Sequence, residues 1–87
     1  MSSFEFDLMD ELYFPASFDE LVERLSREKK IIYETLTSLL QQEFIVQLQF
    51  NSKTKDFDKL ENPDFSSIEK SSFVATKQGL TAHTGVQ

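Results

Sequence analysis

The amino-acid sequence predicts a single small α+β domain over residues 1–87, mainly helical, with three helices, a two-stranded β-hairpin and a short C-terminal helical turn. Three observations predict this fold class. Apolar residues recur at helical spacing in three successive segments, and a capping box marks the start of the second. An alternating apolar and polar stretch, typical of a half-buried strand, follows the third segment.

The first predicted helix, residues 4–14, carries a wider apolar surface than one core contact needs. Beside its core-facing side lies a second apolar face, formed by Phe6, Met9 and Tyr13. Either the C-terminal segment packs on this second face, or the face forms a homodimer or partner interface. Pro15 ends the helix, because the residue before a proline is disfavoured in the α conformation.

The second and third predicted helices follow one another through a short turn. Ser17 and Glu20 have the S-x-x-E spacing of a capping box, which starts a short helix that ends near Leu25. A turn at residues 26–28 leads into a helix at residues 29–42. Four side chains at helical spacing form its core face: Ile32, Leu36, Leu39 and Leu40.

The rest of the chain predicts a hairpin with a long connection. In the first strand three apolar residues alternate with two glutamines, so we expect the apolar members to face the core: Val46, Leu48 and Phe50. Residues 51–71 are polar and predict a loop, which at about 20 residues is long enough to be functional or mobile. Residues 72–76 predict the antiparallel return strand, and residues 77–83 one or two helical turns that end at Gly85.

The composition excludes several classes of protein. Fifteen acidic residues against nine Lys and Arg give a net charge of −6, which opposes simple nucleic-acid binding unless a basic patch exists. Without cysteine, neither disulfides nor thiolate metal sites are possible. No apolar run reaches the roughly 18 residues of a membrane span, and the acidic N-terminus lacks the basic region of a signal peptide. We therefore expect a cytoplasmic protein that contacts no membrane.

The residue inventory does not favour an enzyme. His83 is the single histidine, has no cysteine to pair with and lies near the C-terminus, where we expect it to be solvated. A metal site gathers three or four well-placed ligands, and no such set is visible. Glycines at positions 79 and 85 alone cannot build a Gly-rich phosphate loop. We expect no catalytic residue, no cofactor and no metal.

The middle of the chain resembles a known family. The segment FDELVERLSREKKIIYETLTSLLQQEFIVQL resembles the core of bacterial winged-helix transcriptional regulators, in which a Leu-x-x-x-Gly-Leu-Ile pattern joins a helix to a strand. Glu43 replaces the glycine of that pattern, so it must adopt a left-handed conformation or the helix must end differently. FVATKQGL is similar to the family's returning strand, with Ala75, Thr76 and Gly79 at its Leu-Thr-x-x-Gly positions.

This resemblance implies a regulator that binds double-stranded DNA through residues 29–42 as the recognition helix. The implied contacts come from that helix, the turn before it and the tip of the hairpin, or wing: Arg27, Lys29, Lys30, Tyr33, Thr37, Lys53 and Lys55. The lysines and the arginine would contact phosphates, whereas the tyrosine and threonine would read bases. Glu34 on the same face would repel phosphate.

The alternative is a winged-helix protein-interaction or assembly module that does not bind DNA, because a fold does not determine a function. The acidic net charge, the surplus apolar face of the first helix and a long wing that contains Phe57 and Phe65 suit a protein partner. We carry both interpretations forward.

Overall fold

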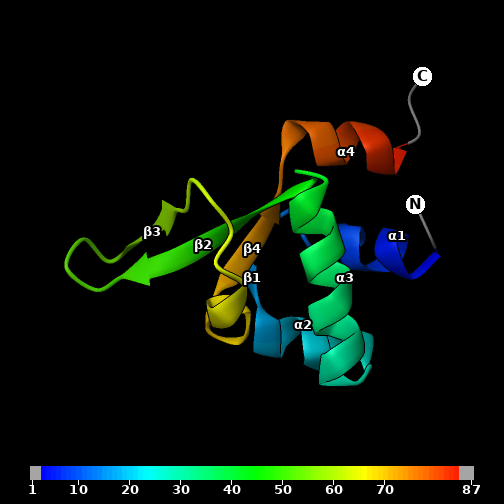
Figure 1. Ribbon diagram of the computed structural model, residues 1–87, viewed down its shortest axis with the longest axis horizontal. Helices are drawn as coiled ribbons and strands as arrows, with labels where there is room; N and C mark the ends of the chain where they lie inside the picture. Colours follow the sequence, from blue (N-terminus) through cyan, green and yellow to red (C-terminus); the bar gives the residue numbers. More distant parts are fainter. Residues whose placement is uncertain (1–2, 85–87) are drawn as a thin grey trace.

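The computed structural model describes residues 3–84 and shows an α+β domain in which helices surround one end of an antiparallel sheet (Figure 1). The elements, in chain order, are α1 (Ser3–Asp10), β1 (Ala16–Ser17), α2 (Phe18–Leu25), α3 (Lys29–Gln41), β2 (Ile45–Asn51), β3 (Asp56–Lys59), the 3-10 helix η1 (Phe65–Lys70), β4 (Ser72–Ala75) and α4 (Lys77–Thr84). The mixed α+β class is confirmed. The predicted arrangement of three helices and a two-stranded wing is wrong, because the sheet has four strands.

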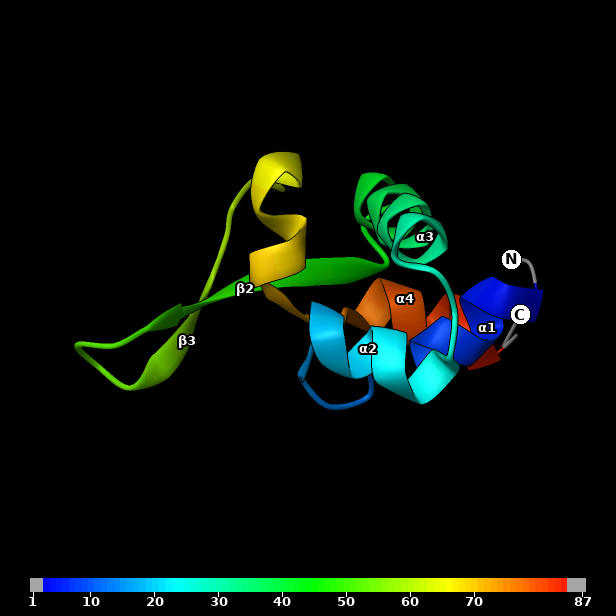
Figure 2. The same cartoon turned by 90° about the horizontal axis from the view of Figure 1, so that it is seen from below.

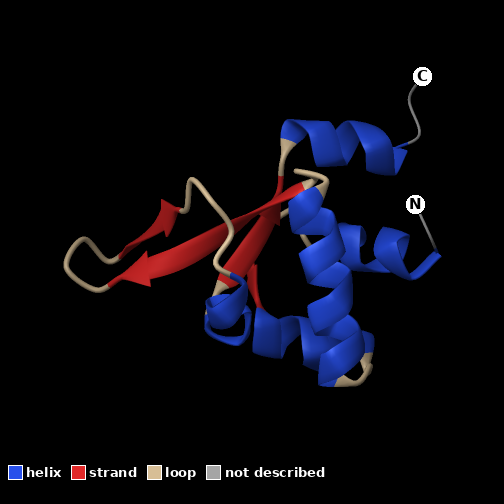
Figure 3. Ribbon diagram, viewed as in Figure 1, coloured by secondary structure: helices blue, strands red, loops and turns tan. Residues whose placement is uncertain are grey.

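The strand order is β1-β4-β2-β3, with every neighbouring pair antiparallel. Strand β4 pairs with the first half of β2, from Ile45 to Leu48, and β3 pairs with the second half, from Leu48 to Asn51, on the other side. The β2–β3 hairpin therefore extends past the end of β4 and projects from the helices (Figures 2 and 3). This projection gives the molecule its elongated dimensions of 40 × 28 × 19 Å.

Two predicted segments have different structures. The first helix ends at Asp10 instead of residue 14, because the chain turns there to join the sheet. The Leu12 carbonyl accepts a 2.8 Å hydrogen bond from the Ala75 N–H, and Ala16 then pairs with Phe73. The predicted loop at residues 51–71 contains both β3 and η1. Gly85, the predicted stop of the last helix, lies outside the described residues.

The predicted core face of the first strand is wrong in part: Leu48 is buried as expected and Val46 is half-buried, but Phe50 is not in the core. Ile45 and Gln47, each 2% exposed, face the core, whereas Phe50 is 58% exposed. The buried Gln47 amide is satisfied by three partners. Its Nε2 donates to the Asp64 carbonyl and the Ser71 hydroxyl at 3.0 and 2.8 Å, and its Oε1 accepts from the Asp64 N–H at 2.8 Å. A buried polar side chain is tolerated when it is hydrogen-bonded, and a pattern of apolar residues cannot reveal this.

The helix–turn–helix segment forms as predicted. Both hydrogen bonds of the capping box between Ser17 and Glu20 are present, and the chain turns at Ser26 in a left-handed conformation. The predicted core face of α3 is confirmed, since its four apolar side chains are at most 3% exposed. They pack with Leu8, Leu12 and Phe73 in one core.

Glu43 adopts the left-handed conformation, the first of the two alternatives predicted for it, with φ 61°. The Phe44 N–H donates to the Leu39 carbonyl and the Glu43 N–H to the Leu40 carbonyl, both at 3.0 Å, which is the Schellman pattern of a helix end. The start of α4 then covers this corner. Thr76 donates through its N–H to the Phe44 carbonyl at 2.9 Å and through its hydroxyl to the Glu43 carbonyl at 2.8 Å.

Gly79 lies against the same corner. A Cβ at this position would lie 1.8 Å from the Phe44 carbonyl oxygen and 2.7 Å from its carbon, so no side chain fits. The Thr76 hydroxyl also accepts the Gly79 N–H at 2.9 Å and so caps α4. The Thr-x-x-Gly spacing noticed in the sequence therefore has a physical reason: it joins α4 to the end of α3.

Candidate interaction surfaces

Four of the seven residues that the family resemblance implied for DNA lie on α3: Lys29, Lys30, Tyr33 and Thr37. Lys29 and Lys30 are exposed in its first turn. Arg27, in the preceding turn, lies over the ring of Phe4, with 5.1 Å from its guanidinium carbon to the ring centroid. This cation–π contact directs Arg27 toward α1.

The two predicted base-reading side chains are used within the protein. The Tyr33 hydroxyl donates to the Phe65 carbonyl of η1 at 3.1 Å, and the Thr37 hydroxyl donates to the Tyr33 carbonyl at 2.9 Å. Tyr33 thereby fastens η1 against α3, a contact that the prediction of a loop at residues 51–71 could not foresee. Donating a hydrogen bond to a base would require both hydroxyls to give up these carbonyl acceptors.

Asp64, the N-cap residue of η1, places a negative charge beside this surface. The Asp64 carboxylate accepts hydrogen bonds from the hydroxyls of Ser66 and Ser67, at 2.6 and 2.8 Å, and from the Ser66 N–H. These hydrogen bonds, above all those of the two hydroxyls, hold the pKa of Asp64 below its usual range. The charge lies next in sequence to the Phe65 carbonyl that Tyr33 contacts, so it opposes a phosphate there.

The projecting hairpin carries a second candidate surface. Phe50 and Phe57 are paired across β2 and β3, with ring centroids 5.5 Å apart and planes at 71°, and they remain 58% and 42% exposed. Lys59, paired with Leu48, lies on the same face because Leu48 is two residues from Phe50. We call this set (Phe50, Phe57 and Lys59) the outer hairpin face. Sequence reasoning singled out Phe57 but not Phe50, because it placed Phe50 in the core.

The opposite face of the hairpin is acidic. Asp58 is paired with Gln49, and Asp56 with Asn51. The Asp58 carboxylate accepts a hydrogen bond from the Asn51 amide at 3.0 Å, and the Asp56 carboxylate accepts the Phe57 N–H at 2.7 Å. The predicted Lys53 and Lys55 are exposed in the turn between the strands, where Lys55 has a φ of 55°.

Charge is unevenly distributed along the chain. Residues 1–24, which include α1 and most of α2, contain seven acidic residues and one arginine and so carry the whole formal charge of −6. Residues 25–87 contain eight acidic and eight basic residues and are neutral. The net charge therefore opposes an anionic partner at α1 and α2 more than at α3 or the hairpin.

The second apolar face of the first helix is covered by α4, as one of the two interpretations expected. Met9 is fully buried, so it offers no surface to a partner, whereas Phe6 and Tyr13 remain 38% and 45% exposed. Their use in a dimer stays a prediction. Both pack on His83, with ring centroids 4.8 and 5.5 Å away.

The expectation that His83 is solvated is wrong, because this side chain is 8% exposed. Its Nδ1 shares a 2.9 Å hydrogen bond with the Tyr13 hydroxyl. Its Nε2 lies 2.7 Å from Asp10 Oδ1, at ion-pair distance but without the alignment of a hydrogen bond. The wide apolar face of the first helix was the signal that could have placed α4, and His83 with it, on α1.

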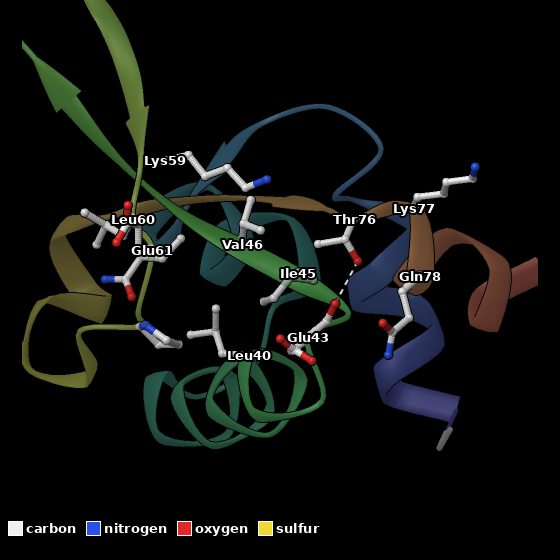
Figure 4. A pocket seen from close by; sticks show the side chains of 12 residues that line it. Leu40, Glu43, Ile45, Val46, Lys59, Leu60, Glu61, Thr76, Lys77 and Gln78 are labelled. Carbon is white, nitrogen blue, oxygen red and sulfur yellow. Dashed lines mark hydrogen bonds between the residues drawn. The ribbon is translucent and has the colours of Figure 1, made fainter.

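An open groove of about 610 Å³ lies between the C-terminal end of α3, strand β2 and the start of α4 (Figure 4). It is lined by charges of both signs: Glu43, Lys59, Glu61 and Lys77. Lys59 and Val46 point to the side of the sheet opposite α3. Because its charges are mixed, the groove does not select a ligand of one charge.

Within residues 3–84, no group of three or more His, Cys, Asp or Glu side chains could hold a metal ion, and no helix is long and apolar enough to cross a membrane. Comparison with protein-family models, curated proteins and solved structures gave no match.

Proposed function

We propose that this chain is a winged-helix protein-interaction module and that the outer hairpin face is its binding element. The helix–turn–helix of α2 and α3 followed by a projecting hairpin supports the winged-helix interpretation. The observation that carries the function is the exposed pair of Phe50 and Phe57 at the end of a hairpin that the core does not need.

The physical argument concerns unburied aromatic area. Fully burying a phenylalanine contributes about 1.5–3 kcal/mol, and the two rings leave 58% and 42% of their surfaces in water. Exposed aromatic clusters of this kind are typical of protein-binding surfaces. Neither phenylalanine belongs to the buried hydrophobic core, so the packing of the core does not depend on them.

Capture from the source cells by chemical cross-linking tests the proposal. The variant Phe50→Ser/Phe57→Ser should lose a specific partner while its free energy of unfolding changes by less than about 1 kcal/mol. Phe14→Ser, which alters a phenylalanine that is 80% exposed outside the hairpin, is the matched control and should keep the partner. An unchanged set of captured proteins in the hairpin variant, or unfolding of that variant, would contradict the proposal.

DNA binding is the second candidate. It is favoured by the family resemblance and by the distribution of charge. The acidic excess lies in residues 1–24, whereas residues 25–87, which include Lys29 and Lys30, are neutral. Titration with mixed duplex DNA at about 50 mM salt tests it, since phosphate attraction is strongest at low salt. Binding that Lys29→Glu/Lys30→Glu abolishes would establish this function, and no binding at that salt would exclude it.

A further inference from the structure

We infer that the Tyr13 hydroxyl is a nucleophile activated by His83 and is a modification site for uncharged acyl donors. The inference concerns the contact between α1 and α4, at the end of the molecule away from the hairpin (Figure 2), and it does not rest on the proposed function. It follows from three side chains that lie in a row: the Asp10 carboxylate, the His83 imidazole and the Tyr13 hydroxyl.

The position of Asp10 decides which nitrogen of His83 carries the proton. Nε2 lies 2.7 Å from Asp10 Oδ1. A carboxylate accepts a proton but has none to donate, so it favours a proton on the nitrogen beside it. Neutral His83 therefore carries its proton on Nε2 and keeps the lone pair of Nδ1. Because Nδ1 lies 2.9 Å from the Tyr13 hydroxyl, this hydroxyl donates its hydrogen bond to a free base.

The surroundings of the pair suit proton transfer. His83 is 8% exposed and packs between the rings of Phe6 and Tyr13, so little water competes for its nitrogen. Tyr13 itself is 45% exposed, so a dissolved reagent can reach it. A hydroxyl nucleophile next to a base, with a third group behind the base, is the arrangement that activates nucleophiles in enzymes. A base positioned in this way contributes roughly 10²–10⁴ in rate.

The reaction is an acyl transfer. The Tyr13 oxygen forms a bond to the carbonyl carbon of an activated acyl donor, and its proton moves to His83 Nδ1. The bond from the carbonyl carbon to the leaving group then breaks, and the leaving group takes the electron pair and the proton from the imidazolium. The Asp10 carboxylate stabilises this imidazolium while it exists. The product is an aryl ester on Tyr13.

The charge of this region selects the donor. Residues 1–24, which include Asp10 and Tyr13, carry the formal charge of −6. They repel an anionic donor such as an acyl phosphate, whereas an uncharged donor approaches without this penalty.

The two tyrosines of the chain give an internal comparison. The Tyr33 hydroxyl donates to a backbone carbonyl, which is too weak a base to take its proton. The protein is treated near neutral pH with N-acetylimidazole, an uncharged acetyl donor, and peptide mapping by mass spectrometry gives the rate at each tyrosine. Acetylation of Tyr13 should be at least about tenfold faster than that of Tyr33. With acetyl phosphate, an anionic donor, the preference for Tyr13 should be smaller.

Because Tyr33 is also less exposed than Tyr13, variants separate the effect of the base from that of exposure. Asp10→Asn removes the charge that stabilises the imidazolium and should slow acetylation of Tyr13 at least about tenfold, without changing Tyr33. Asp7→Asn, an exposed change of the same charge on the same helix, should leave both rates unaltered. His83→Asn should abolish the preference for Tyr13.

A pH profile of the unaltered protein tests the base without any substitution. A tyrosine that reacts only as phenolate gains about tenfold in rate per pH unit up to about pH 10, whereas base-assisted attack levels off above about pH 8, once the imidazole is neutral. Equal acetylation of both tyrosines, no acetylation of Tyr13, or a Tyr13 rate that rises to pH 10 or is unaltered by Asp10→Asn would overturn the inference. An equal or larger preference for Tyr13 with acetyl phosphate would overturn the choice of an uncharged donor.

Discussion

The two ends of strand β2 lie in very different surroundings. At its start, Ile45 and Gln47 are 2% exposed and are enclosed by α3, β4 and the start of α4. At its end, Phe50 is 58% exposed and has only β3 beside it. A polar residue of this strand, Gln47, is buried, whereas its aromatic residue, Phe50, is exposed. The start of β2 therefore stabilises the fold, whereas its end is available to a partner.

The largest expected effect is at the enclosed end. Gly79→Ala should lower the free energy of unfolding by about 3 kcal/mol, because the new methyl group would overlap the Phe44 carbonyl and both neighbours are backbone. Urea unfolding measures this change. Lys77→Ala, an exposed change in the same helix, is the control. Equal stability of the two variants would show that α4 does not pack closely on the Phe44 backbone.

The buried glutamine gives the next effect. Gln47→Met keeps the side-chain volume but leaves the N–H and carbonyl of Asp64 without this partner, so we expect a loss of about 2 kcal/mol. Gln49→Met, two residues along the strand and exposed, should change stability by less than about 0.5 kcal/mol. Similar losses for both variants in urea unfolding would contradict the difference between the two ends of β2.

A stabilising change is expected at the end of α3. Glu43→Gly relieves a left-handed conformation that costs a non-glycine residue about 1–2 kcal/mol, part of which the added freedom of glycine offsets in the unfolded chain. The thermal midpoint should rise, by the equivalent of about 0.5–1 kcal/mol. Gln42→Gly, one residue earlier with φ −86°, should lower it, and a drop for both variants would refute the explanation.

The smallest effect concerns pH. Hydrogen bonds to the backbone N–H and hydroxyl of Ser17 lower the pKa of Glu20, and those to the Ser66 and Ser67 hydroxyls lower the pKa of Asp64. Because both folded pKa values lie below the unfolded ones, this stabilisation is present at neutral pH. It is lost as the pH falls below about 4 toward the folded pKa values.

Urea unfolding at pH 7 and at pH 3 measures that loss. Glu20→Gln/Asp64→Asn should show a smaller drop in unfolding free energy between these two pH values than the wild type does. Glu23→Gln, an exposed change on α2, should leave the drop unaltered. An identical pH dependence in all three proteins would show that the two hydrogen-bonded carboxylates do not contribute.

The sequence correctly predicted the features that depend on residues close together in the chain. The capping box at Ser17, the bounds of α2 and the core face of α3 were predicted, because each depends on residues within one or two helical turns. The left-handed conformation of Glu43 was one of the two alternatives predicted there, for the same reason. Of the outer hairpin face, the sequence singled out Phe57, assigned Phe50 to the core and did not single out Lys59, whereas Lys53 and Lys55 were named only as DNA contacts, which stays a prediction.

The sequence by itself determined an α+β domain with a helix–turn–helix at its centre, since propensity, capping and apolar spacing are local properties. Tertiary contacts alone decided which face of β2 is buried, that residues 51–71 form a strand and a 3-10 helix, and that α4 covers α1. Gln47 lies inside because Asp64 and Ser71 supply its hydrogen bonds, and His83 is buried because Tyr13 and Asp10 lie beside it. These partners are distant in sequence, so no local pattern encodes them.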